Sequence, residues 1–386
     1  MNCSKRAVVC GALLLALAAA QNRDDILLID THNDVTSLTV DGFDIAKHND
    51  KGHTDIARLR AGGVGAVFFA AYVAASYAKS GRSAHRTLEM IDTVRHDIVA
   101  AHPDTFQLAL TADDIEAAHR AGKIAALIGI EGGHAIEDSL RLLRDYYVLG
   151  VRYMTLTHVN TNGWADSSGD MDDRSIEHHN GLTPFGRQVV LEMNRLGMMV
   201  DISHVADKTF WDVIAVSKAP PIASHSSCRA LTNVPRNMTD DMIRALAKKG
   251  GVVDVNFNCG FLSQKSAAVE KPYDAREKAA KTDAERNAIE AEAKRAVPRA
   301  TLADVVANID HIVKLVGVDY VGIGSDFDGV DCTPVGLDDV SKFPNLTRAL
   351  REKGYSEPDI RKIYGGNVLR VMRAVESEAA REQKRR

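Results

Sequence analysis

Residues 26–35, ILLIDTHNDV, have the pattern of a buried strand that ends in polar residues. Four aliphatic residues lead directly into a polar group in which His32 and Asp34 stand two positions apart. Side chains at positions i and i+2 of a strand point the same way, so both would project together from the strand end. A histidine and a carboxylate aimed at one point can bind a metal, bond to each other or form a polar turn. Taken alone, the segment favours the turn, and the rest of the chain has to decide.

The same sequence of a short apolar run and a helix-like segment recurs along the chain. Eight strands alternating with helices indicate an α/β protein with a parallel sheet, and eight is the number that closes a (β/α)8 TIM-like barrel. A doubly wound open sheet is the alternative, weakened because no glycine-rich phosphate turn follows the first strand. The expected strands are 26–30, 64–73, 124–132, 151–158, 198–204, 220–225, 251–257 and 320–326.

Two segments interrupt the alternation. Residues 161–182 form a polar stretch rich in glycine and aspartate, which indicates a loop. Residues 264–300 are charged and are expected to form a helical insertion. The sequence shows no internal repeat and no domain linker, so we expect residues 21–386 to form a single barrel domain.

The first 20 residues have the pattern of an export signal. Lys5 and Arg6 precede the apolar run VVCGALLLALAAA, which ends in small residues before Gln21. This run is shorter than the roughly 20 residues that span a bilayer, and no other segment is long and apolar enough. We expect cleavage near Ala20 and an exported protein, periplasmic or secreted, without a transmembrane span. An uncleaved apolar tail is the alternative.

Composition narrows the class of protein further. The net charge of −4 comes without a basic stripe, so nothing indicates a nucleic-acid partner. Three cysteines follow the signal segment, Cys228, Cys259 and Cys332, and the sequence does not indicate which two would pair in an oxidising compartment. No Cys-x-x-Cys pattern is present, which disfavours a thiolate zinc site.

Polar residues collect immediately after the expected strands. The C-terminal strand ends of a (β/α)8 barrel meet at one face, where catalytic residues lie. Each residue has an ordinary interpretation as well: a single histidine is more often structural, Glu131 could cap a helix, and Asp326 and Asp328 could belong to a turn. Together they favour a metal site, because burying several carboxylates and imidazoles without a cation is costly. The residues are His32, Asp34, Glu131, His158, His204, His225, Asp326 and Asp328.

The expected ligand set holds three histidines and two carboxylates. Nitrogen and oxygen donors without cysteine suit zinc, with manganese, cobalt or iron as alternatives. Five ligands exceed the number that one open catalytic zinc uses. We therefore expect two metal ions that share a bridging carboxylate and hold a hydroxide between them. The ligands are His32, Asp34, Glu131, His204 and His225.

Seven segments resemble the membrane dipeptidase (renal dipeptidase) family, the M19 metallopeptidases of the amidohydrolase superfamily. They occur in the family's order and span residues 30 to 330. The segments are DTHNDV, GIEGGHAI, RYMTLTHVNTNGWADSS, GLTPFGRQVVLEMNRLGMMVDISHV, ASHSSCRAL, VPRNMTDDMIRALAKKGGVVDVNF and GIGSDFDGV.

The resemblance implies a (β/α)8 barrel that holds two zinc ions. His32 and Asp34 would bind one ion, His204 and His225 the other, and Glu131 would bridge them. The remaining family positions also match: His158 would contact the substrate carbonyl, Arg236 would bind the substrate carboxylate, and Asp326 would transfer protons.

The resemblance also implies hydrolysis of dipeptides, both L-L and L-D, by a hydroxide held between the metals. Family members in animals are lipid-anchored dimers; a homodimer is expected here, and no C-terminal anchor signal is present. Other amidohydrolase reactions on amides, lactones or β-lactams are the nearest alternative. A non-catalytic exported protein that binds zinc or peptides is a more distant one.

Overall fold

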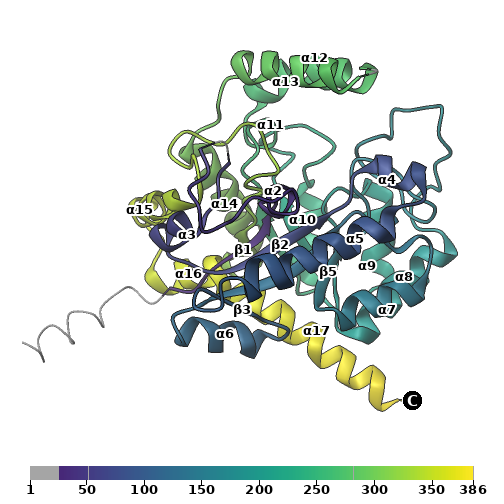
Figure 1. Cartoon of the computed structure of the whole chain (residues 1–386), viewed down its shortest axis with the longest axis horizontal. Helices are drawn as coiled ribbons and strands as arrows, with labels where there is room; N and C mark the ends of the chain where they lie inside the picture. The colour runs from purple at the N-terminus through teal and green to yellow at the C-terminus, as the bar shows by residue number, and fades with distance from the viewer. Residues whose placement is uncertain (1–25, 51, 281, 386) are drawn as a thin grey trace, which may run out of the picture.

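The computed structural model describes residues 26–50, 52–280 and 282–385 (Figure 1). Eight strands form a parallel barrel in the order β1-β2-β4-β5-β6-β7-β8-β9, which confirms the predicted (β/α)8 fold. The barrel closes between its first and last strands, where the N–H of Asp326 donates to the carbonyl of His32 at 3.0 Å. The strands are β1 Leu28–Asn33, β2 Val64–Tyr72, β4 Ile124–Glu131, β5 Val151–Thr155, β6 Met199–Asp201, β7 Ile222–Ser226, β8 Val252–Val255 and β9 Val321–Ile323. The expected signal segment lies outside the described residues.

The strands are buried along almost their whole length. All eight residues of β4 are buried, as expected for a parallel strand that is covered on both sides. One strand was not predicted: β3, Phe106–Leu108, pairs with β4 outside the barrel path. Its three residues are too few to show a periodic pattern.

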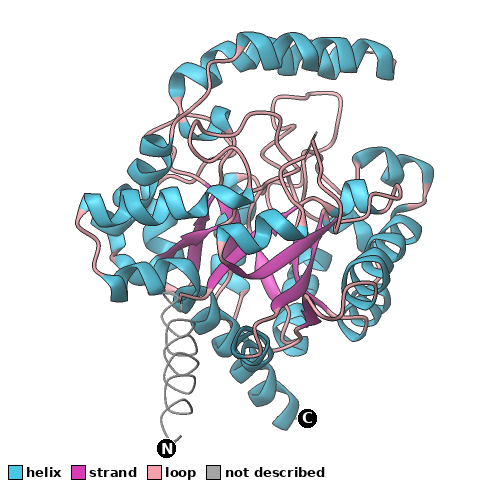
Figure 2. Ribbon diagram, turned by 60° about the vertical axis from the view of Figure 1, so that its left-hand side comes forward, coloured by secondary structure: helices cyan, strands magenta, loops and turns pink. Residues whose placement is uncertain are grey.

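Helices surround the barrel as an outer layer (Figure 2). Helix α8, Pro184–Leu196, shows how the sequence sets their ends. Thr183 accepts a hydrogen bond from the N–H of Gly186, Pro184 starts the first turn, and Gly197 ends the helix at φ 89°. The other helices with more than six residues are α3 Ile56–Gly62, α5 Ser83–Asp92, η1 Thr93–Ala100, α6 Ala112–Arg120, α7 Leu140–Val148, α9 Asp207–Val216, α10 Asp240–Lys248, α12 Gln264–Ala279, α13 Asp283–Ala296, α14 Leu302–Val316, α15 Phe343–Lys353 and α17 Asn367–Lys384.

The shorter helical turns lie in the connections. They are α2 Thr36–Thr39, α4 Ala75–Ser80, η2 Gly133–Ile136, α11 Cys259–Leu262, η3 Val318–Tyr320, η4 Val340–Lys342, α16 Glu357–Arg361 and η5 Lys362–Gly366. Within the described part of the chain, no helix combines the length and the apolar composition that crossing a bilayer requires.

Two apolar clusters hold these layers together. The larger one packs the outer faces of the strands against the surrounding helices. The smaller one contains Phe68 and Tyr153 from the barrel and Met372 from α17, so the C-terminal helix closes one end of the barrel. The opposite, C-terminal ends of the strands are left free for the polar residues.

Helices α12 and α13 form an arm that stands away from the barrel (Figures 1 and 2). The arm follows the short helix α11, which begins at Cys259. A disulfide joins Cys259 to Cys332 in the connection after β9 and so ties the base of the arm to the barrel. The pairing that the sequence left open is thereby settled, and Cys228 is a buried free thiol.

Candidate metal and catalytic site

The eight residues to which the family resemblance gives a role all come from the C-terminal side of the barrel. His32 is in β1 and Asp34 follows it; Glu131 ends β4, and His225 lies within β7. The other four stand in connections: His158 after β5, His204 after β6, Arg236 after β7 and Asp326 after β9. The barrel therefore gathers residues from six connections or strand ends around one place.

Glu131 lies at the middle of the group. Its Oε1 is 3.0 Å from Nε2 of His204 and 3.3 Å from Nε2 of His225. The same oxygen is 3.6 Å from Nε2 of His32, which in turn is 3.3 Å from Oδ2 of Asp34. One carboxylate is thus shared by the two pairs that were expected to bind separate ions.

Two features of the donor atoms indicate that these residues fit a cation. Nε2 of His32 and Oδ2 of Asp34 are buried and have no hydrogen-bond partner. Nε2 of His204 and Nε2 of His225 are only 2.9 Å apart, so two lone pairs would face each other if both neutral rings carried their hydrogen on Nδ1. Three sets of donors can each converge on one ion: His32, Glu131 and His225; Glu131, His158 and His204; His32, Asp34 and Asp326.

The protonation states of His204, His225 and Glu131 favour metal binding as well. His32 differs: burial would lower its pKa, but Tyr153, Asp34 and Glu131 raise it well above the ordinary value. Burial, together with the positive charge of Arg236, lowers the pKa of His204 and of His225 well below the ordinary value, so both rings are neutral at pH 7. Burial alone would raise the pKa of Glu131, but the histidines around it, His158 first, hold that pKa well below its ordinary value. Neutral imidazoles and an ionised carboxylate are the forms that ligate metals.

Asp326 differs from the other carboxylates. Burial and the negative charges of Asp34 and Glu131 raise its pKa well above the ordinary range. Its φ of 62° lies in the left-handed region, which a non-glycine residue adopts at a cost of roughly 1 kcal/mol or more. His204 has a φ of 66°. Such strain is concentrated at functional sites, and here it turns both side chains toward the same centre.

Arg236 is held above this centre by two of its three guanidinium nitrogens. Nη1 donates to Oγ of Ser226 at 2.8 Å and Nη2 donates to the carbonyl of His225 at 2.7 Å. Nε is buried and has no partner. Burial lowers the pKa of Arg236 to about 10, which leaves it protonated at pH 7. A fixed cation with an unsatisfied donor suits a carboxylate ligand.

Sequence reasoning missed two residues of the site. The ring of Tyr72, at the end of β2, lies edge-on to His158 with centroids 4.9 Å apart. Asn256, just after β8, donates to Asp326. Both stand at C-terminal strand ends, so the rule that selected the histidines would have found them had it been applied to uncharged polar residues.

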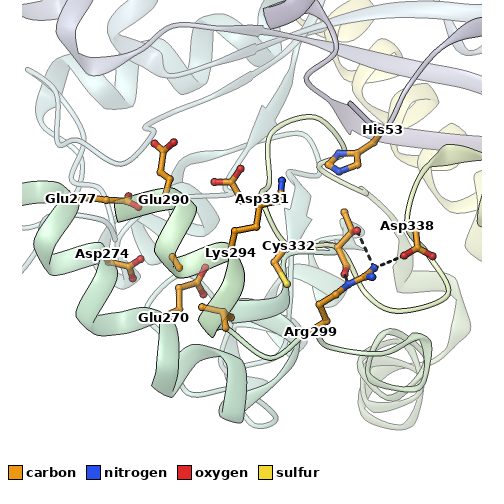
Figure 3. A pocket seen from close by; sticks show the side chains of 13 residues that line it. His53, Glu270, Asp274, Glu277, Glu290, Lys294, Arg299, Asp331, Cys332 and Asp338 are labelled. Atoms are coloured by element: carbon orange, nitrogen blue, oxygen red, sulfur yellow. Dashed lines mark hydrogen bonds and ion pairs between the residues drawn. The ribbon is translucent and has the colours of Figure 1, made fainter. Parts of the chain in front are cut away.

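A separate cavity of about 350 Å³ lies between the arm and the connection after β9 (Figure 3). It contains none of the eight site residues. Glu270 lines it, and burial together with Asp274, Glu277 and Asp331 raises the pKa of Glu270 to about 7. The cavity is therefore a feature of the arm and not part of the centre around Glu131.

Comparison with known proteins agrees with this geometry. The family model of membrane dipeptidases, peptidase family M19, matches residues 19–386. The chain belongs to this family. Members of M19 are metallopeptidases that cleave dipeptides, so this M19 chain is a metallodipeptidase. The family that its sequence segments resemble is thereby confirmed.

Individual relatives give the same result. The M19 chain is 40% identical to dipeptidase verJ of Clonostachys rogersoniana, over 91% of this chain and 85% of that one. The probable dipeptidase PvdM of Pseudomonas aeruginosa has a similar structure, with a TM-score of 0.80, 25% identity and coverage of 96% and 100% of the two chains. A metallopeptidase of Rhodobacter sphaeroides, solved with a phosphinate mimic of L-Ala-D-Ala, gives a TM-score of 0.73 and 27% identity over 91% and 99%.

Proposed function

We propose that this protein is an exported zinc dipeptidase that uses two metal ions, with Glu131 as their shared ligand. His32 and Asp34 would hold one ion, and His204 and His225 the other. The observation that carries the proposal is the position of Oε1 of Glu131, which lies within 3.6 Å of a ligand nitrogen from each pair. A carboxylate in that position could serve both ions.

When bound, two zinc ions would lower the pKa of a coordinated water toward neutrality and supply a nucleophile at pH 7. The chain's own residues would do the rest. His158, whose Nε2 is 3.8 Å from Oε1 of Glu131, would donate to the carbonyl oxygen of the scissile bond as negative charge develops there. Removing one such donor typically costs about 3 kcal/mol of transition-state stabilisation.

Asp326 would accept a proton from the attacking water and deliver it to the leaving amine. Its position supports this role, because its carboxyl lies within reach of His32 and Asp34, beside the place where the water would bind. Arg236 would bind the free carboxylate of the substrate through its unsatisfied Nε. Since that carboxylate must lie next to the metals, only very short peptides would fit.

The substrate proposed is a dipeptide of L residues, and L-D dipeptides as well. The phosphinate mimic of L-Ala-D-Ala in the Rhodobacter sphaeroides relative supports the second class. Export is supported by the disulfide between Cys259 and Cys332, since such bonds persist in oxidising compartments.

Reconstitution tests the proposal. Metal-free protein receives zero, one or two equivalents of zinc, and turnover is measured with L-Ala-L-Ala and L-Ala-D-Ala. We expect full activity to need two equivalents. Full activity with one equivalent, or without metal, would overturn the two-ion proposal, and absence of L-D cleavage would limit the substrate class to L-L dipeptides.

A further inference from the structure

A buried hydrogen-bond chain lies behind His225, outside the donor atoms that face the centre. Nδ1 of His225 is 2.7 Å from Oγ of Ser224, and Oγ of Ser224 is 2.6 Å from Oδ2 of Asp201. All three side chains are fully or almost fully buried. The hydrogens in the chain must therefore be shared among these groups and not with solvent.

Asp201 receives hydrogen bonds at both of its oxygens. Oδ1 accepts from the backbone N–H groups of Ser203 at 3.1 Å and Ser224 at 2.9 Å. Oδ2 accepts from the hydroxyls of Ser224 and Thr155, at 2.6 and 2.5 Å. Hydroxyl-to-oxygen distances of 2.5–2.7 Å are those of hydrogen bonds to a charged carboxylate, so Asp201 acts as an acceptor toward all four groups.

The direction of the chain follows from this. The hydroxyl of Ser224 uses its one hydrogen on Asp201, and its contact with Oγ of Ser203 is much longer, at 3.5 Å. It can therefore only accept from His225, which puts the ring hydrogen on Nδ1. Nε2 of His225 is left with its lone pair, and this is the nitrogen 3.3 Å from Glu131.

We infer that Asp201 is a positioning residue that acts through Ser224 to fix the tautomer of His225 that can bind a metal. The inference rests on the proposed two-ion centre. Histidine ligands commonly donate their second N–H to a partner that sets the tautomer, and loss of the partner typically weakens metal binding about 10- to 100-fold.

A different hydrogen-bond chain sets the same tautomer of His32, with the ring hydrogen on Nδ1. Its Nδ1 is 2.7 Å from the hydroxyl of Tyr153, which donates to the carbonyl of Thr31 at 3.0 Å. The chain behind His32 thus ends on a neutral carbonyl, whereas the chain behind His225 ends on a carboxylate. A variant at Asp201 should therefore affect one ion, and Tyr153→Phe should affect the other.

Asp201→Asn tests the direction of the chain with a side chain of the same shape. The amide oxygen would face the two backbone N–H groups, and the amide N–H₂ would face the hydroxyls. Ser224 would then accept from Asn at 201 and donate to Nδ1 of His225, which moves the ring hydrogen to Nε2. We expect one zinc equivalent to bind at least 10-fold more weakly in a chelator competition, while the second is retained.

Nitrogen NMR of metal-free protein labelled in histidine gives a readout independent of activity. The His225 signal, assigned by its loss in His225→Gln, should show the hydrogen on Nδ1 in the unmodified protein and on Nε2 in Asp201→Asn. Ser224→Ala, which removes only the intervening hydroxyl, should weaken the same zinc equivalent. It serves as the second variant if Asp201→Asn does not fold.

Thr155→Val is the matched control, because it removes the other hydroxyl from Oδ2 of Asp201 but leaves Ser224 and His225 linked. We expect it to keep both zinc equivalents and the Nδ1 tautomer. Equal weakening in Thr155→Val and Ser224→Ala, or an unchanged tautomer and affinity in Asp201→Asn, would overturn the inference. If the unmodified protein binds fewer than two zinc ions, the proposed function fails instead.

Discussion

Asn256 donates a hydrogen bond of 2.8 Å from its side-chain amide to Oδ2 of Asp326. This bond holds one carboxyl oxygen, while the carboxyl group as a whole stays within reach of His32 and Asp34. Because His32, Asp34 and Glu131 remain as the proposed ligands, Asp326→Asn should leave metal binding intact and lower kcat about 10²- to 10⁴-fold, the range that proton transfer by a positioned group supplies. Zinc content and steady-state kinetics measure the two effects separately.

Asp328→Asn is the control for that substitution. Asp328 also follows β9, but its Oδ1 accepts from the N–H of His53 at 2.6 Å and not from a group in the centre. We expect kcat to change far less than in Asp326→Asn. Near-normal kcat in Asp326→Asn would exclude the proton-transfer role.

Glu131→Ala should remove both zinc ions or leave them loosely held, because Oε1 is the oxygen that a histidine from each ligand pair approaches. Elemental analysis after gel filtration measures the bound metal. Glu137→Ala, which changes an exposed carboxylate that accepts from the N–H of Ala84, should retain two equivalents. Two firmly bound ions in Glu131→Ala would contradict the shared-ligand assignment.

Arg236→Ala should raise KM for dipeptides roughly 10- to 100-fold, since a hydrogen bond to a charged group contributes about 1.5–3 kcal/mol. An amidated dipeptide lacks the carboxylate, so its KM should rise much less. Arg229→Ala provides the comparison, because Arg229 is paired with Asp207 at 2.7 Å. The same effect on acid and amide would remove Arg236 from carboxylate recognition.

Reducing the disulfide should destabilise the protein. The bond joins residues 73 positions apart, and closing a loop of that length in the unfolded chain corresponds to about 4 kcal/mol. We expect Cys259→Ser and reduced protein to show the same lower Tm by calorimetry. A reductant should then have no further effect on Cys259→Ser, and a reductant-sensitive Tm in that variant would point to another cause.

Glu270 should make stability depend on pH. Its pKa is about 7 in the folded protein and near 4.5 when unfolded, so the fold favours the protonated form. The stabilisation that comes from protonated Glu270 is complete below about pH 4.5 and is lost as the pH rises through 7. Glu270→Gln should therefore raise the free energy of unfolding at pH 8 by about 1–3 kcal/mol and change it little at pH 4.5.

Glu290→Gln, which removes an exposed carboxylate from the same cavity, should show no such pH dependence. Chemical denaturation at pH 4.5 and pH 8 compares the two variants. If Glu270→Gln raised the free energy of unfolding equally at both pH values, ionisation of Glu270 would not be the source of the gain.

The sequence predicted those parts of the fold whose pattern of apolar and polar residues recurs along the chain. The barrel strands are short apolar runs, six of which end at or just before a selected polar residue, and the rule that strand ends meet at one face brought His32 and His225 together from distant positions. Asp201 and Tyr153 could not be selected in this way. Both lie inside the expected strands, 198–204 and 151–158, where a polar residue is indistinguishable by pattern from one that merely satisfies a neighbour. The cysteine pairing depends on the distance between Cys259 and Cys332, which no spacing rule supplies.

Because the site residues come from both ends of the barrel, recovery of activity can be used to follow the closure of the barrel during folding. The hydrogen bond from the N–H of Asp326 to the carbonyl of His32 joins the two ends of the barrel, which are nearly 300 residues apart in the sequence. Contacts between residues so far apart in sequence form slowly during folding. Recovery of turnover after dilution from denaturant is therefore expected to trail the return of helical signal, and the enzyme reports the joining of its own first and last strands.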